Sequence, residues 1–162
     1  MTHERTVGDW TLSDDPARFD LARAHRWIAD ESYWAKDIPL AVFRRAVENS
    51  LTVGAYAASN RMAAMARVVT DRATFGWIGD VFVDKEHRGR ALGKLLMTYI
   101  RAHPDLQGLR RLHLATQDAH GLYAQFGFGP LTGTDRWMEV RDLATYGAAS
   151  DERRLNIPFT DP

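Results

Sequence analysis

The sequence has 162 residues and equal numbers of basic and acidic residues, 21 of each, so its formal net charge is zero. This length is typical of a single domain, and the charge balance argues against a nucleic-acid binder, which usually carries a basic excess. The chain contains no cysteine, which excludes disulfides, thiolate metal sites and a cysteine nucleophile and fits a reducing compartment. The sequence shows neither a signal-peptide pattern nor a run of about 18 apolar residues, so we expect a cytoplasmic protein without a membrane span.

We expect one domain over residues 1–143, followed by a tail over residues 144–162 in which glycine, alanine, serine and charged residues predominate. Residues 1–9 are polar, and we predict that they are frayed. The segment from Trp10 to Ser13 is predicted as a first short strand.

Two helices are expected before the main run of strands. The acidic pair and the proline at 14–16 favour a helix start, because acidic side chains stabilise the positive end of the helix dipole. We expect this first helix to end near Ser32. Pro39 suits the first turn of a second helix, which we expect to run to Asn49.

The hydrophobic pattern then changes from helical to extended spacing and predicts an antiparallel meander. Its strands are expected at 51–58, 62–70 and 75–83, the last of these strongly apolar and central. Apolar residues next recur at helical spacing over 89–101, and Pro104 ends that predicted helix.

The C-terminal part is predicted to continue with a strand at 111–116 and a short helix at 119–126. Further strands are expected at 128–131 and 137–140. Because a helix joins the strands at 75–83 and 111–116, we expect these two strands to run parallel. The sequence therefore predicts an α/β fold with a mixed, mostly antiparallel sheet flanked by helices.

The loop after the central strand carries the residues that most suggest chemistry. Arg88, Gly89 and Arg90 lie just before the predicted helix core, and Gly93 and Lys94 lie in its first turn. A helix N-terminus offers unpaired backbone N–H groups and a positive dipole, and glycine lets a ligand approach the backbone closely. These features together predict a pyrophosphate site. The same residues also allow a simpler interpretation, a solvated basic helix start.

Two familiar phosphate motifs do not fit this loop. A P-loop needs four residues between its glycines and then Gly-Lys-Ser/Thr, whereas Gly89 and Gly93 enclose three residues and Lys94 is followed by Leu95. A dinucleotide fingerprint needs G-x-G-x-x-G spacing, which the loop lacks.

A third pattern fits. The run from Arg88 to Gly93, after the predicted strand at 75–83, resembles the Gln/Arg-x-x-Gly-x-Gly/Ala loop of GCN5-related N-acetyltransferases. The run from Leu122 to Phe128 resembles the Leu-Tyr-x-x-x-Gly-Phe segment of the same family. Ala91 stands where the family usually has glycine, a departure that is mild if the backbone there is helical and costly if it needs a positive φ. Thr116 stands where many members carry asparagine.

The resemblance implies how acetyl-CoA would be held. It implies a wedge in which the strand at 75–83 splays from the strand at 111–116, so that the pantetheine arm pairs with backbone like an added strand. It also implies that loop amides hold the pyrophosphate and that an N–H near Phe82 or Val83 polarises the thioester carbonyl. The implied acetyl-CoA-binding residues are Val81, Phe82, Val83, Arg88, Gly89, Arg90, Ala91, Leu92, Gly93, Lys94, Thr116 and Tyr123.

The family's reaction is direct attack of a primary amine on the thioester, and two residues are candidates for its proton transfers. Tyr123 matches the family's usual proton donor to the leaving thiolate, although core packing would also explain a tyrosine here. Asp80 on the central strand is a candidate general base. Asp80 could equally pair with an arginine such as Arg67, and a chain of water molecules could take the proton instead.

Strand geometry gives an expected orientation for Asp80. On a regular strand successive side chains alternate between the two faces. Asp80 is therefore expected to share a face with Ile78 and Phe82, opposite Val81 and Val83. A carboxylate among apolar neighbours is the reason for considering it as the base.

The acceptor amine is expected to bind near the connection between the first two helices. Tyr33 and Trp34 in that connection are predicted to wall the pocket, with Trp77 and Trp137 as weaker candidates. A lid over the core would also explain Tyr33 and Trp34. Aromatic walls near acidic residues suit a cationic amine on a small molecule or a peptide. We expect no metal site, because the histidines lack metal-binding spacing and cysteine is absent.

Other functions compete with the N-acetyltransferase interpretation. A non-catalytic acyl-CoA-binding sensor or interaction module of the same fold would be compatible with the departures at Ala91 and Thr116. Transfer to a hydroxyl, or from a longer acyl-CoA, is a further alternative. The resemblance leaves a homodimer open, and we expect neither a membrane nor a nucleic-acid partner.

Overall fold

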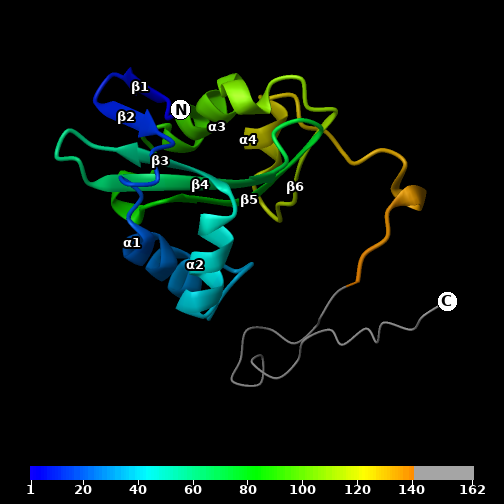
Figure 1. Ribbon diagram of the computed structural model, residues 1–162, viewed down its shortest axis with the longest axis horizontal. Coiled ribbons are helices and arrows are strands. Elements are labelled where there is room, and N and C mark those ends of the chain that lie inside the picture. The colour runs from blue at the N-terminus through cyan, green and yellow to red at the C-terminus, as the bar shows by residue number, and fades with distance from the viewer. Residues whose placement is uncertain (141–162) are drawn as a thin grey trace.

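The computed structural model describes residues 1–140 as one mixed sheet with helices on both of its faces (Figure 1). The sheet has six strands in chain order, and every neighbouring pair is antiparallel except the last, in which β5 and β6 run parallel. The strands are β1 (Glu4–Val7), β2 (Trp10–Ser13), β3 (Leu51–Tyr56), β4 (Met62–Thr70), β5 (Phe75–Val83) and β6 (Arg111–Leu114). The predicted α/β fold with a mostly antiparallel sheet is confirmed.

Two groups of helices cover opposite faces of the sheet, as Figure 1 shows. One group packs around Met65 and Phe82, and the other packs on the face that carries Val53 and Ile78. The first group is α1 (Leu21–Arg26), the π-helical turn η1 (Trp27–Glu31) and α2 (Leu40–Glu48), and the second is α3 (Leu92–Ala102) and α4 (His120–Ala124). Short 3-10 turns are η2 (Lys85–His87), η3 (Pro104–Leu106) and η4 (Thr134–Arg136). Among the helices of residues 1–140, none is long and apolar enough to cross a bilayer.

The prediction that residues 1–9 are frayed is wrong, because Glu4–Val7 forms the edge strand β1. It pairs with β2 in an antiparallel hairpin, and Gly8 adopts a left-handed φ of 56° at the turn. Every β1 side chain is exposed, so the strand has no buried face and gives no hydrophobic alternation for sequence analysis to detect.

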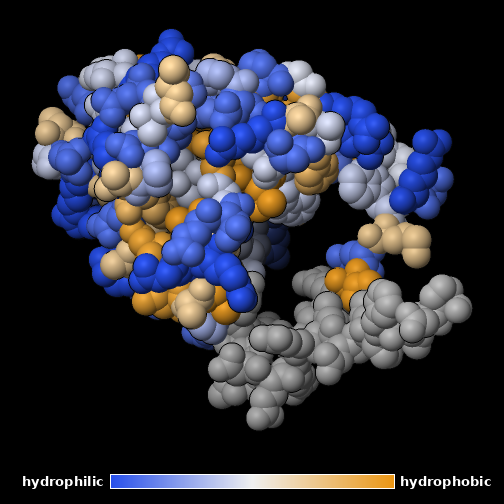
Figure 2. Space-filling view, viewed as in Figure 1, coloured by the Kyte–Doolittle hydropathy of each residue, from blue (hydrophilic) through white to orange (hydrophobic). Residues whose placement is uncertain are grey.

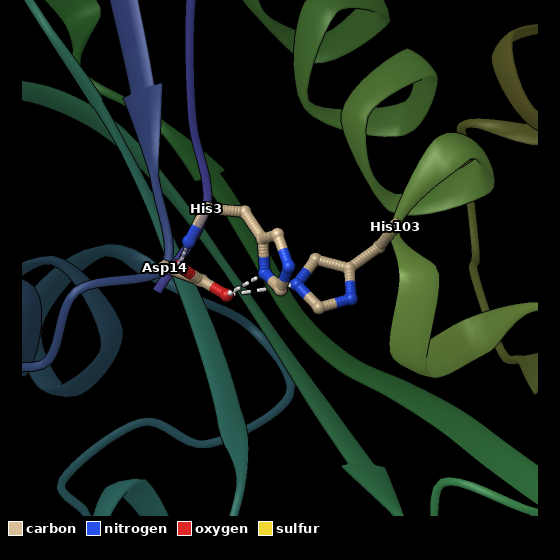
Figure 3. A group of neighbouring side chains, drawn as sticks. All are labelled: His3, Asp14 and His103. Carbon is tan, nitrogen blue, oxygen red and sulfur yellow. Dashed lines mark hydrogen bonds and ion pairs between the residues drawn. The ribbon is translucent and has the colours of Figure 1, made fainter. Parts of the chain in front are cut away.

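A partly buried polar cluster holds this hairpin to the rest of the domain (Figure 3). Asp14 Oδ1 accepts from the His3 backbone N–H, and Asp14 Oδ2 lies 3.1 Å from His3 Nδ1 and 2.9 Å from His103 Nε2. His103 Nδ1 accepts from the Asp105 backbone N–H at 3.1 Å. The proton of the neutral imidazole therefore lies on Nε2, which donates to Asp14. Tyr99 completes the contact by donating its hydroxyl proton to the His3 carbonyl oxygen at 2.6 Å.

A β-bulge in β5 changes which side chains share a face. The register shifts by one between the pairs Arg67–Asp80 and Val68–Ile78, which leaves Gly79 as the extra residue. Asp80 therefore shares a face with Phe82, as predicted, but Ile78 does not. Ile78 packs with the α3 side of the core, where Val81 and Val83 also pack. The prediction for Ile78 is wrong because it assumed an unbroken alternation through Gly79.

The segment after α4 does not form the strands predicted at 128–131 and 137–140. Pro130 has no N–H to donate to a ladder, and Gly133 has a left-handed φ of 64° just before η4. The segment instead leads away from the sheet (Figure 1). The tail predicted at 144–162 lies outside the described residues.

Candidate active site

The strands β5 and β6 pair over only part of their length and then diverge. Their parallel register runs from Phe75–Arg111 to Ile78–Leu114 and ends there. Beyond Ile78, β5 stays paired with β4 on its other side up to Val83. The bulge at Gly79 lies at the point of divergence, and such bulges bend a strand and end its pairing. Within residues 1–140, one edge of β5 between Gly79 and Val83 is thus without a strand partner, and this is the wedge that the family resemblance implied.

The backbone groups on this open edge belong to Val81 and Val83. The Asp84 N–H donates to the Ala63 carbonyl of the β4 side. In an antiparallel ladder, alternate residues point their polar groups to the same partner, so the N–H and C=O of Phe82 face β4. Those of Val81 and Val83 face the wedge. The Val83 carbonyl accepts from Arg88 Nε at 3.2 Å on that side. Phe82 and Val83 were the two residues predicted to offer an N–H to the thioester carbonyl. The N–H of Val83 faces the wedge and could do so, whereas that of Phe82 faces β4.

The turn that leads from β5 into α3 contains two left-handed residues. Gly89 has a φ of 76° and Ala91, at the N-cap of α3, has a φ of 59°. No side chain of the described residues caps this helix, so these residues leave the N–H groups of its first turn available at the positive end of the helix dipole. Arg88, Arg90 and Lys94 are exposed around them. Ala91 therefore has the positive φ that is costly for a residue with a β-carbon.

A cavity of about 670 Å³ extends from the wedge toward α2 and the connection that precedes it. Its walls include Tyr33, Trp34 and Trp77, three of the predicted acceptor-pocket residues. In the view of Figure 2, apolar side chains gather over α1 and α2 and near the centre of the face, between charged ones. The lining residues are Tyr33, Trp34, Ala35, Ile38, Val42, Phe43, Ala46, Arg67, Trp77, Ile78, Gly79, Asp80, Val81, Leu114, Ala115, Thr116, Gln117, Asp118, Ala119 and Tyr123.

Tyr123 lies on α4, is 9% exposed and lines this cavity. Its ring packs edge-on against Phe128, with ring centroids 6.1 Å apart. Burial raises the pKa of the Tyr123 hydroxyl, and the nearby Tyr33 and Asp118 raise it further. The hydroxyl therefore stays protonated at neutral pH, which is the state a proton donor requires.

Asp80 is 4% exposed and both of its carboxylate oxygens are hydrogen-bonded. Oδ2 accepts from Arg67 Nε at 2.6 Å, and Oδ1 accepts from Trp34 Nε1 at 2.8 Å. Arg67 Nη1 in turn donates to Ser50 Oγ at 3.1 Å. Of the two alternatives weighed for Asp80, the structure contains the pair with Arg67, and its role as general base stays a prediction.

Tyr33 joins the two sides of the cavity. Its hydroxyl accepts from the Gln117 backbone N–H at 2.9 Å, which links the α1–α2 connection to the loop after β6. Its ring meets that of Trp34 edge-on, with centroids 5.0 Å apart. Thr116 in the same loop accepts from the Ala119 N–H through Oγ1 at 3.1 Å. The hydroxyl of Thr116 thus stabilises the start of α4, and the residue lines the cavity beside it.

Trp137 does not line this cavity. Its ring packs at a tilt against that of His113, with centroids 4.8 Å apart, and the Arg111 guanidinium lies 5.3 Å from its centroid. It faces a separate hollow together with Arg111 and Arg136. The prediction of Trp137 as an acceptor-pocket residue assumed a last strand in the sheet, and the chain leaves the sheet before reaching it.

Two groups of potential metal ligands occur in the described part of the chain. They are His3, Asp14 and His103, and Asp84, Glu86 and His87. The carboxylate of each group already has protein donors, since Asp84 accepts from Arg23 Nη2 at 2.5 Å and from the Glu86 N–H at 3.2 Å. The carboxylates of Asp14 and Asp84 are therefore engaged in hydrogen bonds within the protein.

Comparison with known proteins agrees with this geometry. The sequence model of the acetyltransferase (GNAT) family matches residues 9–128. The chain is a member of the GNAT acetyltransferase family.

Two solved structures and one curated protein are similar to this chain. A GNAT protein of Xanthomonas campestris pv. campestris is 48% identical and superimposes with a TM-score of 0.81, over 85% of this chain and 96% of its own. A protein of meticillin-resistant Staphylococcus aureus is 26% identical, with a TM-score of 0.62 over 82% of this chain and 99% of its own. An acetyltransferase of Gibberella zeae is 27% identical over 141 residues, which cover 74% of this chain and 78% of that one.

Sequence reasoning missed several features of this GNAT site. The apolar wall formed by Val42, Phe43 and Ala46 was not singled out, because these residues fall in the predicted second helix and fit its buried face. Gly79 was not recognised as a bulge, although a glycine inside an apolar strand is the usual signal for one. The bond between Tyr33 and Gln117 leaves no sequence signal, because it joins a side chain to a backbone group far along the chain.

Proposed function

We propose that this GNAT protein transfers the acetyl group of acetyl-CoA to a primary amine by direct attack of the amine on the thioester. One observation carries the proposal. The open edge of β5, with the backbone groups of Val81 and Val83, borders a cavity into which the protonated Tyr123 also faces. Exposed backbone groups suit an extended ligand such as a pantetheine arm, because pairing with them needs no particular side chain.

The surrounding residues fit a coenzyme A ester. The uncapped first turn of α3 and the left-handed turn before it present N–H groups to an anion, and Arg88, Arg90 and Lys94 add positive charge. The pyrophosphate would bind at this turn, and the pantetheine would pair with Val81 and Val83. The open end of the cavity, beside Trp34 and Trp77, would then receive the amine.

The proton inventory follows from the same residues. A nitrogen–carbon bond forms and the carbon–sulfur bond breaks, so the amine loses one proton and the leaving sulfur gains one. The Tyr123 hydroxyl would supply the proton to sulfur. An edge N–H of β5 would stabilise negative charge on the carbonyl oxygen. Asp80 would accept a hydrogen bond from the amine and orient it, and the amine proton would leave through Asp80 or water.

Ligand binding comes first in testing this proposal. The melting temperature is measured with acetyl-CoA, CoA and ATP, each at about 100 times its expected dissociation constant, where binding adds roughly 2.7 kcal/mol of stability. For a domain of this size, that corresponds to a rise of roughly 5–10 °C. A rise with both CoA compounds but not with ATP supports the proposal, and no rise with any of them contradicts it.

Turnover separates the enzyme from a binding module. Release of CoA from acetyl-CoA is followed with a thiol reagent, and the chain contributes no background because it has no cysteine. CoA release that depends on an added primary amine supports acetyl transfer. Binding of acetyl-CoA without release, across amines and alcohols, would favour the acyl-CoA-binding module instead.

A further inference from the structure

We propose that the acceptor is an α-amino acyl group, that is, a primary amine with a carbonyl or carboxylate oxygen on the adjacent carbon, carrying an apolar side chain. The inference rests on the proposed function. Its structural basis is the ion pair between Arg67 and Asp80, whose side chains line the end of the cavity where the amine substrate would bind.

Arg67 has one hydrogen-bond donor group, Nη2, that residues 1–140 leave unused. Its Nε donates to Asp80 and its Nη1 donates to Ser50. Among the described residues, no acceptor takes a hydrogen bond from Nη2. The Arg67 side chain is only 16% exposed and lines the cavity. A donor in such a place is costly when a ligand displaces its water without replacing the bond.

The position of Nη2 is set by the bulge in β5. A β-carbon added at Gly79 would lie 2.8 Å from Arg67 Nη2, so a larger residue there would displace the guanidinium. Gly79 is also where β5 and β6 diverge. The unused donor therefore lies beside the mouth of the wedge, where an acceptor must approach the acyl group.

Asp80 offers the complementary acceptor next to this donor. Its Oδ1 accepts one hydrogen bond, from Trp34 Nε1, and a carboxylate oxygen can accept two. Asp80 and Arg67 thus form a neutral pair that presents one acceptor and one donor to the same space. An amine beside a carbonyl oxygen satisfies both, whereas a simple alkylamine satisfies only Asp80.

The rest of the wall selects the side chain. Ile38, Val42, Phe43 and Trp77 line the cavity on the α2 side. Among the lining residues of the described chain, the charged ones are Arg67, Asp80 and the exposed Asp118. This wall offers apolar contact and no second buried carboxylate, so it suits an apolar side chain better than a polyamine or a lysine side chain.

The test compares acceptors that differ in one group. L-phenylalaninamide represents a peptide N-terminus, L-phenylalanine a free amino acid, and phenethylamine the same amine without the carbonyl. Wild-type protein is expected to use the first or the second with a kcat/KM at least tenfold above that of phenethylamine. A preference for the amide indicates a peptide acceptor, and a preference for the free acid indicates an amino acid.

The variant Arg67→Lys decides whether Arg67 causes this preference. Lysine keeps a cation opposite Asp80 but has no second branch to donate. The preference ratio should fall about tenfold in Arg67→Lys, mainly through KM, and stay at the wild-type value in the matched control Arg44→Lys, since Arg44 is exposed on α2. The test compares the preference ratio of the variant with that of wild type, because an adjacent carbonyl also lowers the pKa of the substrate amine. This substrate effect is the same for both proteins and cancels in the comparison.

The outcomes separate the two proposals. If phenethylamine is acetylated as well as phenylalaninamide and phenylalanine, the substrate class is wrong while the proposed function stands. If Arg67→Lys lowers kcat/KM equally for all three, Arg67 only holds Asp80 in place and the inference is overturned. If no primary amine is acetylated although acetyl-CoA binds, both proposals fall. The wild-type comparison decides the substrate class even if the variant does not fold.

Discussion

Arg67 and Asp80 lie directly opposite each other on β4 and β5, and their side chains pair across the bulge, with Nε and Oδ2 2.6 Å apart. This pair lies at the boundary between the core and the acceptor end of the cavity. It is buried on the Asp80 side, where the carboxylate also accepts from Trp34. One ion pair thus connects the stability of the sheet with the shape of the site.

Neutralising Asp80 is expected to cost both stability and activity. In Asp80→Asn the Arg67 cation stays in a largely buried place without its counter-charge, which should lower the free energy of unfolding by roughly 3 kcal/mol. Urea denaturation measures this loss, with Asp9→Asn as a control at an exposed aspartate. If Asp80→Asn is as stable as wild type, the ion pair between Arg67 and Asp80 is too well solvated to contribute to the free energy of unfolding.

Removing the Tyr123 hydroxyl is expected to slow turnover and spare binding. Tyr123→Phe keeps the buried ring and its contact with Phe128, so acetyl-CoA should still raise the melting temperature. Loss of a general acid should lower kcat by at least tenfold, on the order of the contribution such groups make. Tyr99→Phe is the matched control, because Tyr99 is also buried but donates to His3 on the far hairpin. Equal kcat for Tyr123→Phe and wild type would remove Tyr123 from the mechanism.

The same tyrosine fixes the direction of the pH dependence. Because burial raises the pKa of Tyr123 above its usual value of 10.0, the hydroxyl stays protonated below that pH. Deprotonation of Tyr123 should therefore not lower kcat as the pH rises from 7 to about 9.5. A profile of kcat against pH checks this, and a decline in this range that disappears in Tyr123→Phe would contradict it.

Ala91→Gly is expected to stabilise the protein. Ala91 has a φ of 59° at the N-cap of α3, a conformation that costs a residue with a β-carbon about 1–2 kcal/mol and costs glycine almost nothing. Glycine loses more freedom on folding, so the net gain should be about 0.5–1 kcal/mol. Chemical denaturation measures it, and Ala91→Val should show the opposite sign. A less stable Ala91→Gly protein would indicate that the left-handed turn is not strained.

The sequence predicted the parts of the fold that depend on local pattern. The antiparallel strands from Leu51 to Val83, the helix before Pro104 and the parallel return at Arg111 all follow from hydrophobic spacing and from the handedness of crossovers. The exposed basic turn before α3 was predictable too, because its glycine and basic residues are contiguous, and phosphate binding at this turn stays a prediction. These features need no knowledge of distant contacts.

The remaining features depend on contacts that local pattern does not contain. The strand β1 has no buried face, so only its pairing with β2 and the bonds around Asp14 reveal it. The bulge at Gly79 reverses the alternation predicted for Ile78. The prediction for Trp137 assumed a last strand in the sheet. That strand does not form, because Pro130 and Gly133 lead the chain away from the sheet.

The cluster around Asp14 gives a final prediction, on pH and stability. Burial by itself would raise the pKa of Asp14, but the hydrogen bonds from the His3 backbone and from the His103 and His3 side chains outweigh it, and the pKa is lowered from 3.8. A carboxyl whose pKa is lower in the folded state stabilises the fold fully above its unfolded pKa. That stabilisation is lost as the pH falls below about 3.8 through the folded value.

Asp14→Asn should therefore be less stable than wild type by about 1–3 kcal/mol at pH 7, because His103 and the His3 backbone lose a charged acceptor. The difference between the two proteins should stay constant down to about pH 4 and shrink below it, since wild-type Asp14 then becomes neutral as well. Urea unfolding at pH 7, 5, 4 and 3 measures the difference, with Asp9→Asn as the control. If the difference in the free energy of unfolding is unchanged at pH 3, the charge of Asp14 does not hold the hairpin β1–β2 to α3.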